Sequence, residues 1–240
     1  MFEIDFSQLA EGYRHRAPSA ASLGRARRAG ADLAVESHIL DIGGGPGHHA
    51  AVWVEQGHHP VVLDPAVEMA RPAVALGLAV VIGVSQALPF TNAVFDLAWF
   101  HLSLHYGDWR AALDEAVRIT RAGGRIEIWT LGSDHHQRSM LARWFPSVPQ
   151  IDRARFPHEG EVEAFVSDRV SSVEIGTVIE EKTRPAGEWA AAAEAGFVST
   201  LQLVDAAELE TGMAAFRRAY PDPSAEVGYE LRFARIIATR

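Results

Sequence analysis

The sequence contains no cysteine among its 240 residues. This absence excludes disulfides, thiolate zinc clusters and cysteine nucleophiles, and it fits a cytoplasmic location. No run of apolar residues is long enough to span a bilayer, so we expect no membrane partner. The first residues, MFEIDFSQLAEGY, have neither a basic start nor an apolar core, and we expect no secretory signal there.

Lysine is also nearly absent. Of the 22 cationic residues, 21 are arginine and only Lys182 is lysine. The formal net charge of −9 repels phosphate backbones, so we expect no nucleic-acid partner. One basic cluster precedes Asp32. It is either a solvated helix face, which we favour, or a basic lid over an anionic substrate. Its members are Arg14, Arg16, Arg25, Arg27 and Arg28.

Hydrophobic residues make up 48% of the chain, which suits one α/β domain. Strand-like and helix-like segments alternate five times up to residue 131. This pattern predicts a parallel sheet covered by helices on both faces. We expect strands at 38–42, 60–64, 79–83, 95–100 and 125–131, with helices at 47–57, 67–76 and 108–120.

The pattern changes after residue 131. Residues 170–180 are the best candidate for a sixth strand, and residues 196–204 are the alternative. Residues 229–239 predict a final strand, which we expect to be antiparallel and at or near an edge of the sheet. We expect short helices at 20–35, 159–168, 186–195 and 206–220.

Four glycines follow the first predicted strand, in the segment HILDIGGGPG at residues 38–47. A strand, a glycine turn and a helix bring a cofactor close to bare backbone. The dinucleotide fingerprint G-x-G-x-x-G fails here, because its third glycine falls on His48. The pattern acidic-x-G-x-G-x-G is met at every position, by Asp41, Gly43, Gly45 and Gly47.

This glycine turn resembles the first motif of class I S-adenosylmethionine-dependent methyltransferases. The cofactor has no pyrophosphate, but its ammonium needs a carboxylate, and Asp41 stands near that place. Asp64 ends the second strand about 20 residues after the turn, at the ribose-diol position. A ligand-free turn is the alternative, but it does not require so many glycines.

Later segments extend the resemblance over residues 38–131. Residues 83–90, GVSQALPF, match the family's stretch after the third strand, where an aspartate typically holds the adenine amino group. That position is Ser85 here, whose hydroxyl accepts a hydrogen bond without charge. Residues 144–157 and 208–213 carry a fainter resemblance to the small-molecule branch called type 11.

The resemblance implies a Rossmann-like sheet of seven strands, mostly parallel with the last antiparallel. It implies a single domain with an N-terminal helical lid at 1–37 and a cofactor-binding core at 38–131. Substrate-side segments follow at 132–240, and they include a helical insertion before the last strand at 184–226. It also implies the residues that bind S-adenosylmethionine, which are Tyr13, Asp41, Gly43, Gly44, Gly45, Gly47, Asp64, Pro65, Ser85, Gln86, Ala87, Phe100 and His101.

Methyl transfer from a sulfonium is an in-line displacement, in which the enzyme mainly positions the reactants and excludes water. His101 and His105 flank the end of the fourth predicted strand, where ligands sit in open α/β sheets. Either is a candidate general base, or a histidine bonded to backbone or lining the adenosine pocket. Adjacent histidines elsewhere point apart, so we expect no metal.

The sequence therefore predicts methyl transfer to a small-molecule acceptor, by a chain that is a possible homodimer. An NAD(P)-dependent oxidoreductase is one alternative, against which the missing third glycine speaks. The other is a non-catalytic module that binds S-adenosylmethionine, since no base is obvious.

Overall fold

The structure is a computed structural model that describes residues 4–5 and 18–240. The chain divides into two compact units. We call them the sheet unit, of residues 18–130, 159–176 and 234–240, and the helical unit, of residues 4–5, 131–158 and 177–233.

The strands form one seven-stranded sheet with the order β3-β2-β1-β4-β5-β7-β6. The pairs β1–β2, β1–β4, β2–β3 and β4–β5 are parallel, as the nearly continuous apolar strands predict. The strands are β1 (His38–Ile42), β2 (His59–Asp64), β3 (Ala79–Ile82), β4 (Phe95–His101), β5 (Thr120–Leu131), β6 (Ser172–Pro185) and β7 (Glu226–Thr239).

The last strand runs antiparallel, as predicted. The Gly123 amide donates to the Arg240 carbonyl at 2.7 Å, and the Arg240 amide donates to the Gly124 carbonyl at 3.0 Å. Strand β7 lies between β5 and β6, so β6 is the edge strand on this side of the sheet and β3 is the edge strand on the other. The alternative sixth strand at 196–204 is wrong, because Ser199–Leu203 form a 3-10 helix, η2.

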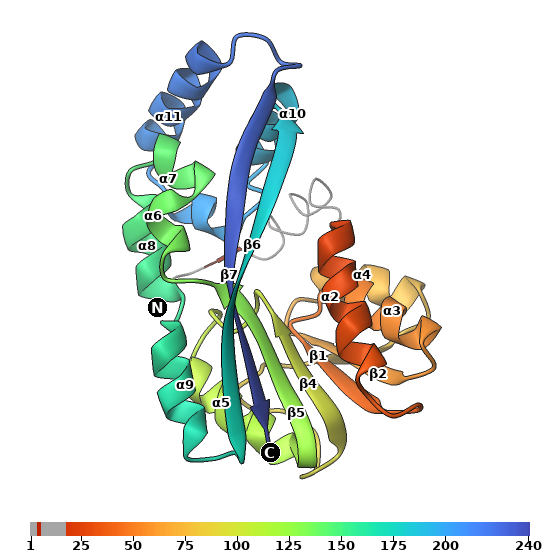
Figure 1. Cartoon of the computed structure of the whole chain (residues 1–240). Coiled ribbons are helices and arrows are strands. Elements are labelled where there is room, and N and C mark those ends of the chain that lie inside the picture. Colours follow the sequence, from red (N-terminus) through yellow and green to blue (C-terminus); the bar gives the residue numbers. More distant parts are fainter. Residues whose placement is uncertain (1–3, 6–17) are drawn as a thin grey trace. The chain divides into compact units, whose positions relative to one another are not determined.

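Helices cover both faces of the sheet unit (Figure 1). The Phe100 side chain of β4 packs into the core cluster that includes Leu113 and Val162 from the helices of one face. The neighbouring Trp99 faces the other way, and its ring lies 5.6 Å from that of Trp53. The helices of this unit are α2 (Ala20–Ala31), α3 (His48–Glu55), α4 (Val67–Ala75), α5 (Trp109–Ile119) and α9 (Glu159–Ser167).

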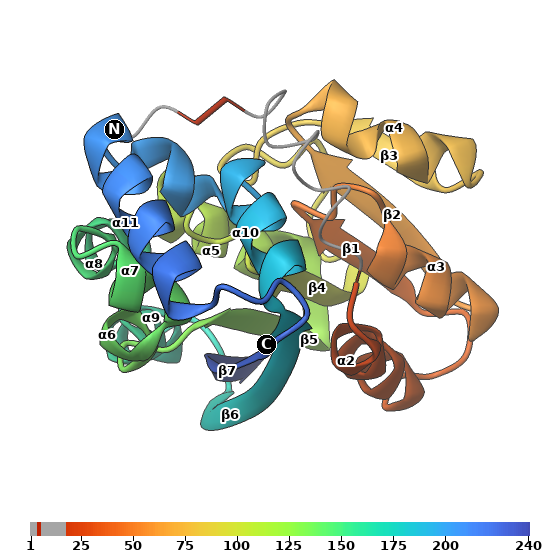
Figure 2. The same ribbon diagram turned by 90° about the horizontal axis from the view of Figure 1, so that it is seen from above.

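The helical unit has its own apolar core. Trp189 and Phe216 stack with their ring centroids 4.3 Å apart and join the last two helices, which lie side by side (Figure 2). The other elements of this unit are short. Its helices are α6 (His135–Arg138), α7 (Met140–Trp144), α8 (Val148–Arg155), α10 (Ala186–Glu194), η2 and α11 (Ala206–Ala219).

Among the described residues, no helix combines the length and the apolar character that a membrane span requires.

Candidate functional site

The glycine turn lies between β1 and α3, at the carboxyl end of the central parallel strands. Gly43, Gly45 and Gly47 have φ angles of 72°, 48° and 78°, in the left-handed region that glycine adopts without a steric penalty. The Gly43 amide donates to the Leu63 carbonyl at 2.7 Å, which ties the turn to β2. The turn is therefore fixed by backbone contacts inside the sheet unit.

The glycines of the turn serve different purposes. A Cβ atom on Gly43 would lie 2.5 Å from Ser103 Cβ, and one on Gly47 would lie 2.5 Å from Leu78 Cδ1. Packing inside the protein therefore requires these two glycines. A Cβ on Gly45 would meet only the flexible tip of Met69, at 3.3 Å, and Asp64 Oδ2, at 3.8 Å. Gly45 is thus the position in the turn where bare backbone leaves room for a ligand.

Asp41 is a buried carboxyl, 1% exposed, at the carboxyl end of β1. Gly44 makes room for it, since a Cβ there would lie 2.5 Å from Asp41 Cγ. Within the described residues, Asp41 Oδ2 has no hydrogen-bond partner. Burial and the nearby Asp64 carboxyl raise the pKa of Asp41 to about 8, so the group is mostly neutral at pH 7 without a ligand.

Asp64 is also buried, 6% exposed, at the end of β2. Its Oδ2 accepts from the Gly45 amide at 3.0 Å, and its Oδ1 accepts from the Ala66 amide at 2.9 Å. Burial raises the pKa of Asp64, and these two backbone hydrogen bonds oppose the rise. The predicted cofactor anchors, the carboxyls of Asp41 and Asp64, thus lie on either side of the turn, and neither points into open solvent.

This arrangement fits the cofactor that the sequence implies. An ammonium donor would satisfy the partnerless Asp41 Oδ2 and stabilise its ionised form. Each Asp64 oxygen keeps a second lone pair for a ribose hydroxyl. Asp41 packs against Gly44, and Asp64 accepts from the next residue of the turn, Gly45.

The loop after β3 carries the predicted adenine contacts. The Gln86 side chain donates to the Tyr106 carbonyl at 3.0 Å, so it holds the loop after β4. Gly107 allows this approach, because a Cβ there would lie 2.3 Å from Gln86 Nε2. Ser85 is half-buried, while Pro65 and Ala87 are exposed.

His101 lies at the end of β4 in a cluster of rings. Its ring centroid is 4.6 Å from that of His49, and its ring stacks parallel to Trp99. Arg25 Nη1 lies 2.9 Å from His101 Nε2. Because a guanidinium only donates, His101 must accept at Nε2 and carry its proton on Nδ1.

Arg25 corrects the expectation of a solvated basic face. Its side chain is 3% exposed, and its guanidinium lies 4.4 Å from the centre of the Trp129 ring. Only Arg27 and Arg28 of the described cluster are exposed. The sequence pattern does not place Arg25, Trp129 and His49 near His101. The one available signal was Gly30, whose lack of a side chain lets α2 lie close to Trp53.

Two other predicted residues are buried. The Phe100 side chain is fully enclosed in the core cluster, so only its backbone is available to a ligand. His105 is 9% exposed, and its ring centroid lies 4.0 Å from that of Tyr106. Tyr13, the remaining predicted contact, lies outside the described residues.

Metal ligands do not gather anywhere in residues 4–5 and 18–240, where no three His, Asp or Glu side chains form a suitable group. Burial, together with His48 and Arg25, lowers the pKa of His49 to about 4. The Trp99 indole donates to His49 Nδ1 at 3.2 Å, so this histidine is a neutral structural residue.

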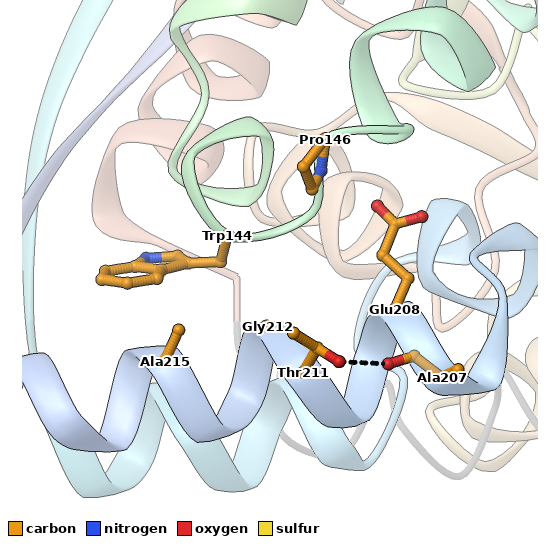
Figure 3. A pocket seen from close by; sticks show the side chains of 7 residues that line it. All are labelled: Trp144, Pro146, Ala207, Glu208, Thr211, Gly212 and Ala215. Atoms are coloured by element: carbon orange, nitrogen blue, oxygen red, sulfur yellow. Dashed lines mark hydrogen bonds between the residues drawn. The ribbon is translucent and has the colours of Figure 1, made fainter.

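The helical unit contains a surface hollow of about 480 Å³ between α7 and α11 (Figure 3). Its one carboxylate, Glu208, accepts from the Ser147 amide at 2.9 Å. The lining is otherwise mostly apolar and consists of Trp144, Pro146, Ala207, Thr211, Gly212 and Ala215.

Residues 40–128 match the model of a methyltransferase domain family. A malonyl-[acyl-carrier protein] O-methyltransferase of Erwinia billingiae is 34% identical over 145 residues, covering 59% of this chain and 57% of the relative. A relative of the same description from Salmonella typhimurium is 37% identical, covering 39% of this chain and 38% of its own. The chain thus matches 57% of the length of the first relative and 38% of the length of the second.

Solved structures share the fold. A protein of Anabaena variabilis, described as a methyltransferase of an antibiotic biosynthesis pathway, superposes with a TM-score of 0.73 at 19% identity. The superposition covers 94% of this chain and 99% of that one. Geranyl diphosphate C-methyltransferase from Streptomyces coelicolor, solved with S-adenosyl-L-homocysteine, gives a TM-score of 0.54 at 16% identity and covers 90% and 76%. Residues 40–128 are thus similar to a methyltransferase domain, and the curated relatives and the shared fold point to the same family.

Proposed function

We propose that this protein transfers a methyl group from S-adenosylmethionine to a small-molecule acceptor by in-line displacement. The observation that carries the proposal is the buried Asp41 Oδ2, which has no hydrogen-bond partner among the described residues and lies against Gly44, next to the bare backbone of Gly45. When bound, the cofactor supplies a methyl group on a positively charged sulfur. The chain has to bind the cofactor, orient it and keep water away.

Each predicted residue has a proposed task. Asp41 accepts from the cofactor ammonium, and Asp64 accepts from the ribose hydroxyls with its free lone pairs. The backbone of the glycine turn and of residues 100–101 borders the adenosyl group. We propose that Tyr13, outside the described residues, covers the methionine end. The adenine ring lies among Pro65, Ser85, Gln86 and Ala87.

A general base is needed only if the acceptor must lose a proton. Arg25 already occupies the His101 Nε2 lone pair, so His101 is poorly placed to accept a proton there. We therefore propose His105 as the base for acceptors that need one, and His101 as a positioning residue.

The names of the curated relatives support a first acceptor to test. Both relatives named above are malonyl-[acyl-carrier protein] O-methyltransferases. A carboxylate oxygen carries its own lone pair and needs no base, which agrees with the occupied His101. We propose an acyl thioester with a free carboxylate as the first candidate in an acceptor panel.

Isothermal titration calorimetry with S-adenosylmethionine tests the cofactor site. An ammonium at Asp41 ionises a carboxyl whose pKa is about 8, so binding at pH 7 should release nearly one proton. That proton appears as a difference in binding heat between buffers with different ionisation enthalpies. Asp41→Asn should lose both the proton release and most of the affinity. Equal heats in both buffers for the unaltered chain would contradict the role of Asp41.

Activity is tested by measuring S-adenosylhomocysteine formation across the acceptor panel. Turnover with one acceptor supports the enzyme. Cofactor binding without turnover on any acceptor favours a non-catalytic binding module. Binding of NAD(H) in place of S-adenosylmethionine favours the oxidoreductase.

A further inference from the structure

The edge strand β3 lies in the longest uncharged stretch of the chain. Residues 72–95 contain no Asp, Glu, Lys, Arg or His, although the chain has a net charge of −9. Four large apolar side chains of α4, β3 and the adjoining turns are each about half exposed or more: Val74, Leu76, Ile82 and Val84. Exposed apolar side chains without nearby charge in the sequence are typical of a surface that contacts another protein.

The outer side of β3 is an open strand edge. Its inner side pairs with β2 in parallel register from Ala79 to Ile82. Strand β3 ends the strand order, so no described strand pairs with its outer side. An edge of this kind presents alternating N–H and C=O groups that another strand can bind.

The opposite edge of the sheet is protected in the usual way. Strand β6 is charged along its length and ends at Pro185, and both features discourage strand pairing between molecules. Its charged residues are Glu174, Glu180, Glu181, Lys182 and Arg184. Strand β3 carries neither charge nor proline.

We propose that β3 pairs with β3 of a second copy of this chain, antiparallel about a two-fold axis. Such a pair is self-complementary, because each strand offers the other the same sequence of donors and acceptors. Two chains of charge −9 repel each other wherever acidic residues meet, and the stretch 72–95 brings none to the contact. A charged partner would find no opposite charge in this stretch. The proposal is independent of the methyltransferase activity.

Sedimentation equilibrium of the full chain, from about 1 to about 100 μM, tests the proposal. The unaltered chain should approach twice its mass of 26.1 kDa within this range. Ile82→Lys places an ammonium on each copy at the two-fold contact and should weaken dimerisation about 100-fold.

A matched control comes from the other edge strand. Ile179 is the same residue type and is 49% exposed on β6, compared with 51% for Ile82 on β3. Ile179→Lys should leave the dimer intact, and both variants should keep the cofactor affinity of the unaltered chain. A monomer at all concentrations would overturn the proposal, as would equal effects of the two lysines.

Cross-linking gives a second measurement that does not rely on disruption. The chain has no cysteine, so a single introduced thiol can form a disulfide only with another copy. Val80→Cys, near the middle of β3, should give a covalent dimer on mild oxidation, because facing strands bring Cα atoms within disulfide range. Ile179→Cys should remain monomeric on a denaturing gel. Cross-linking at position 179 but not at position 80 would overturn the proposal.

Discussion

The Gly45 amide donates a hydrogen bond to Asp64 Oδ2 at 3.0 Å and joins the centre of the glycine turn to the end of β2. The Ala66 amide binds the other oxygen, so the Asp64 carboxyl is oriented before any ligand arrives. Asp41 differs, because burial leaves its Oδ2 without a partner in the described part of the chain. The Asp64 carboxyl is thus pre-oriented, whereas we propose that Asp41 gains a partner only when a donor binds.

Gly45→Val should abolish measurable cofactor binding while the chain remains folded. A branched side chain at position 45 fills the space left by bare backbone, and its left-handed φ of 48° adds a penalty of about 2 kcal/mol. Calorimetry measures the affinity and urea unfolding measures the stability.

Gly77→Val is the matched control for that experiment. Gly77 also has a left-handed φ, of 76°, and a Cβ added there would meet no atom within 4 Å, so the substitution carries a similar backbone penalty outside the site. It should keep the cofactor affinity. Equal losses of affinity in the two variants would show that backbone strain, and not occupied ligand space, explains the Gly45 result.

The Asp41 carboxyl should make the cofactor-free protein less stable as pH rises. Its pKa is about 8 in the folded chain and near 3.8 when unfolded, so between these values the folded state holds a proton that the unfolded state has lost. Stability therefore falls with rising pH through this window. Asp41→Asn removes this titration. The unfolding free energy of the variant minus that of the unaltered chain should therefore rise between pH 5 and pH 8, by a few kcal/mol at most. Urea unfolding at both values measures the difference, and a constant difference would contradict the assignment.

The sheet was predictable because its signals are local. Each parallel strand is a short apolar run, and a glycine or a capping residue bounds the helices between them. Asp108, for example, accepts from the Arg110 amide and begins α5. The start of β5 at Thr120 was missed. The sequence predicts a helix that ends at residue 120 and a strand that begins at residue 125. In the structure the strand already begins at Thr120, which pairs with Phe95 of β4, and the register between β4 and β5 shifts before Leu97.

The positions of the two proposed anchors, Asp41 and Asp64, were predictable, and their surroundings were less so. The glycine spacing and its resemblance to the methyltransferase motif placed these two carboxyls on either side of the turn. The buried position of Arg25 could not be derived, because it depends on how closely α2 approaches the Trp129 and His101 side chains from distant strands. The purpose of Gly43 and Gly47 was also incompletely predicted, since their close neighbours Ser103 and Leu78 come from other parts of the sequence.

His105→Gln and His101→Gln should separate the two histidines. For an acceptor that must lose a proton, His105→Gln should lower kcat by about 10²- to 10⁴-fold, as expected for removal of a general base. A glutamine at position 101 can still accept from Arg25 through its side-chain oxygen, so His101→Gln should keep kcat within about tenfold. Steady-state rates from pH 6 to 9 measure both effects. A larger loss for His101→Gln would reverse the assignment.

Thr200→Val should destabilise the helical unit through its buried polar network. The Thr200 hydroxyl donates to Asp152 Oδ1 at 2.6 Å and accepts from Arg155 Nη1 at 3.1 Å. Valine has nearly the same shape but removes both contacts, and it leaves buried charged groups with fewer partners, at a cost of about 2–4 kcal/mol.

Thr211→Val is the matched control, because the exposed Thr211 hydroxyl donates only to its own helix, at the Ala207 carbonyl. Its loss should change stability by less than about 0.5 kcal/mol. Urea unfolding followed by circular dichroism compares the two variants. Similar small changes in both would mean that the Asp152–Thr200–Arg155 network contributes little to the stability of the helical unit.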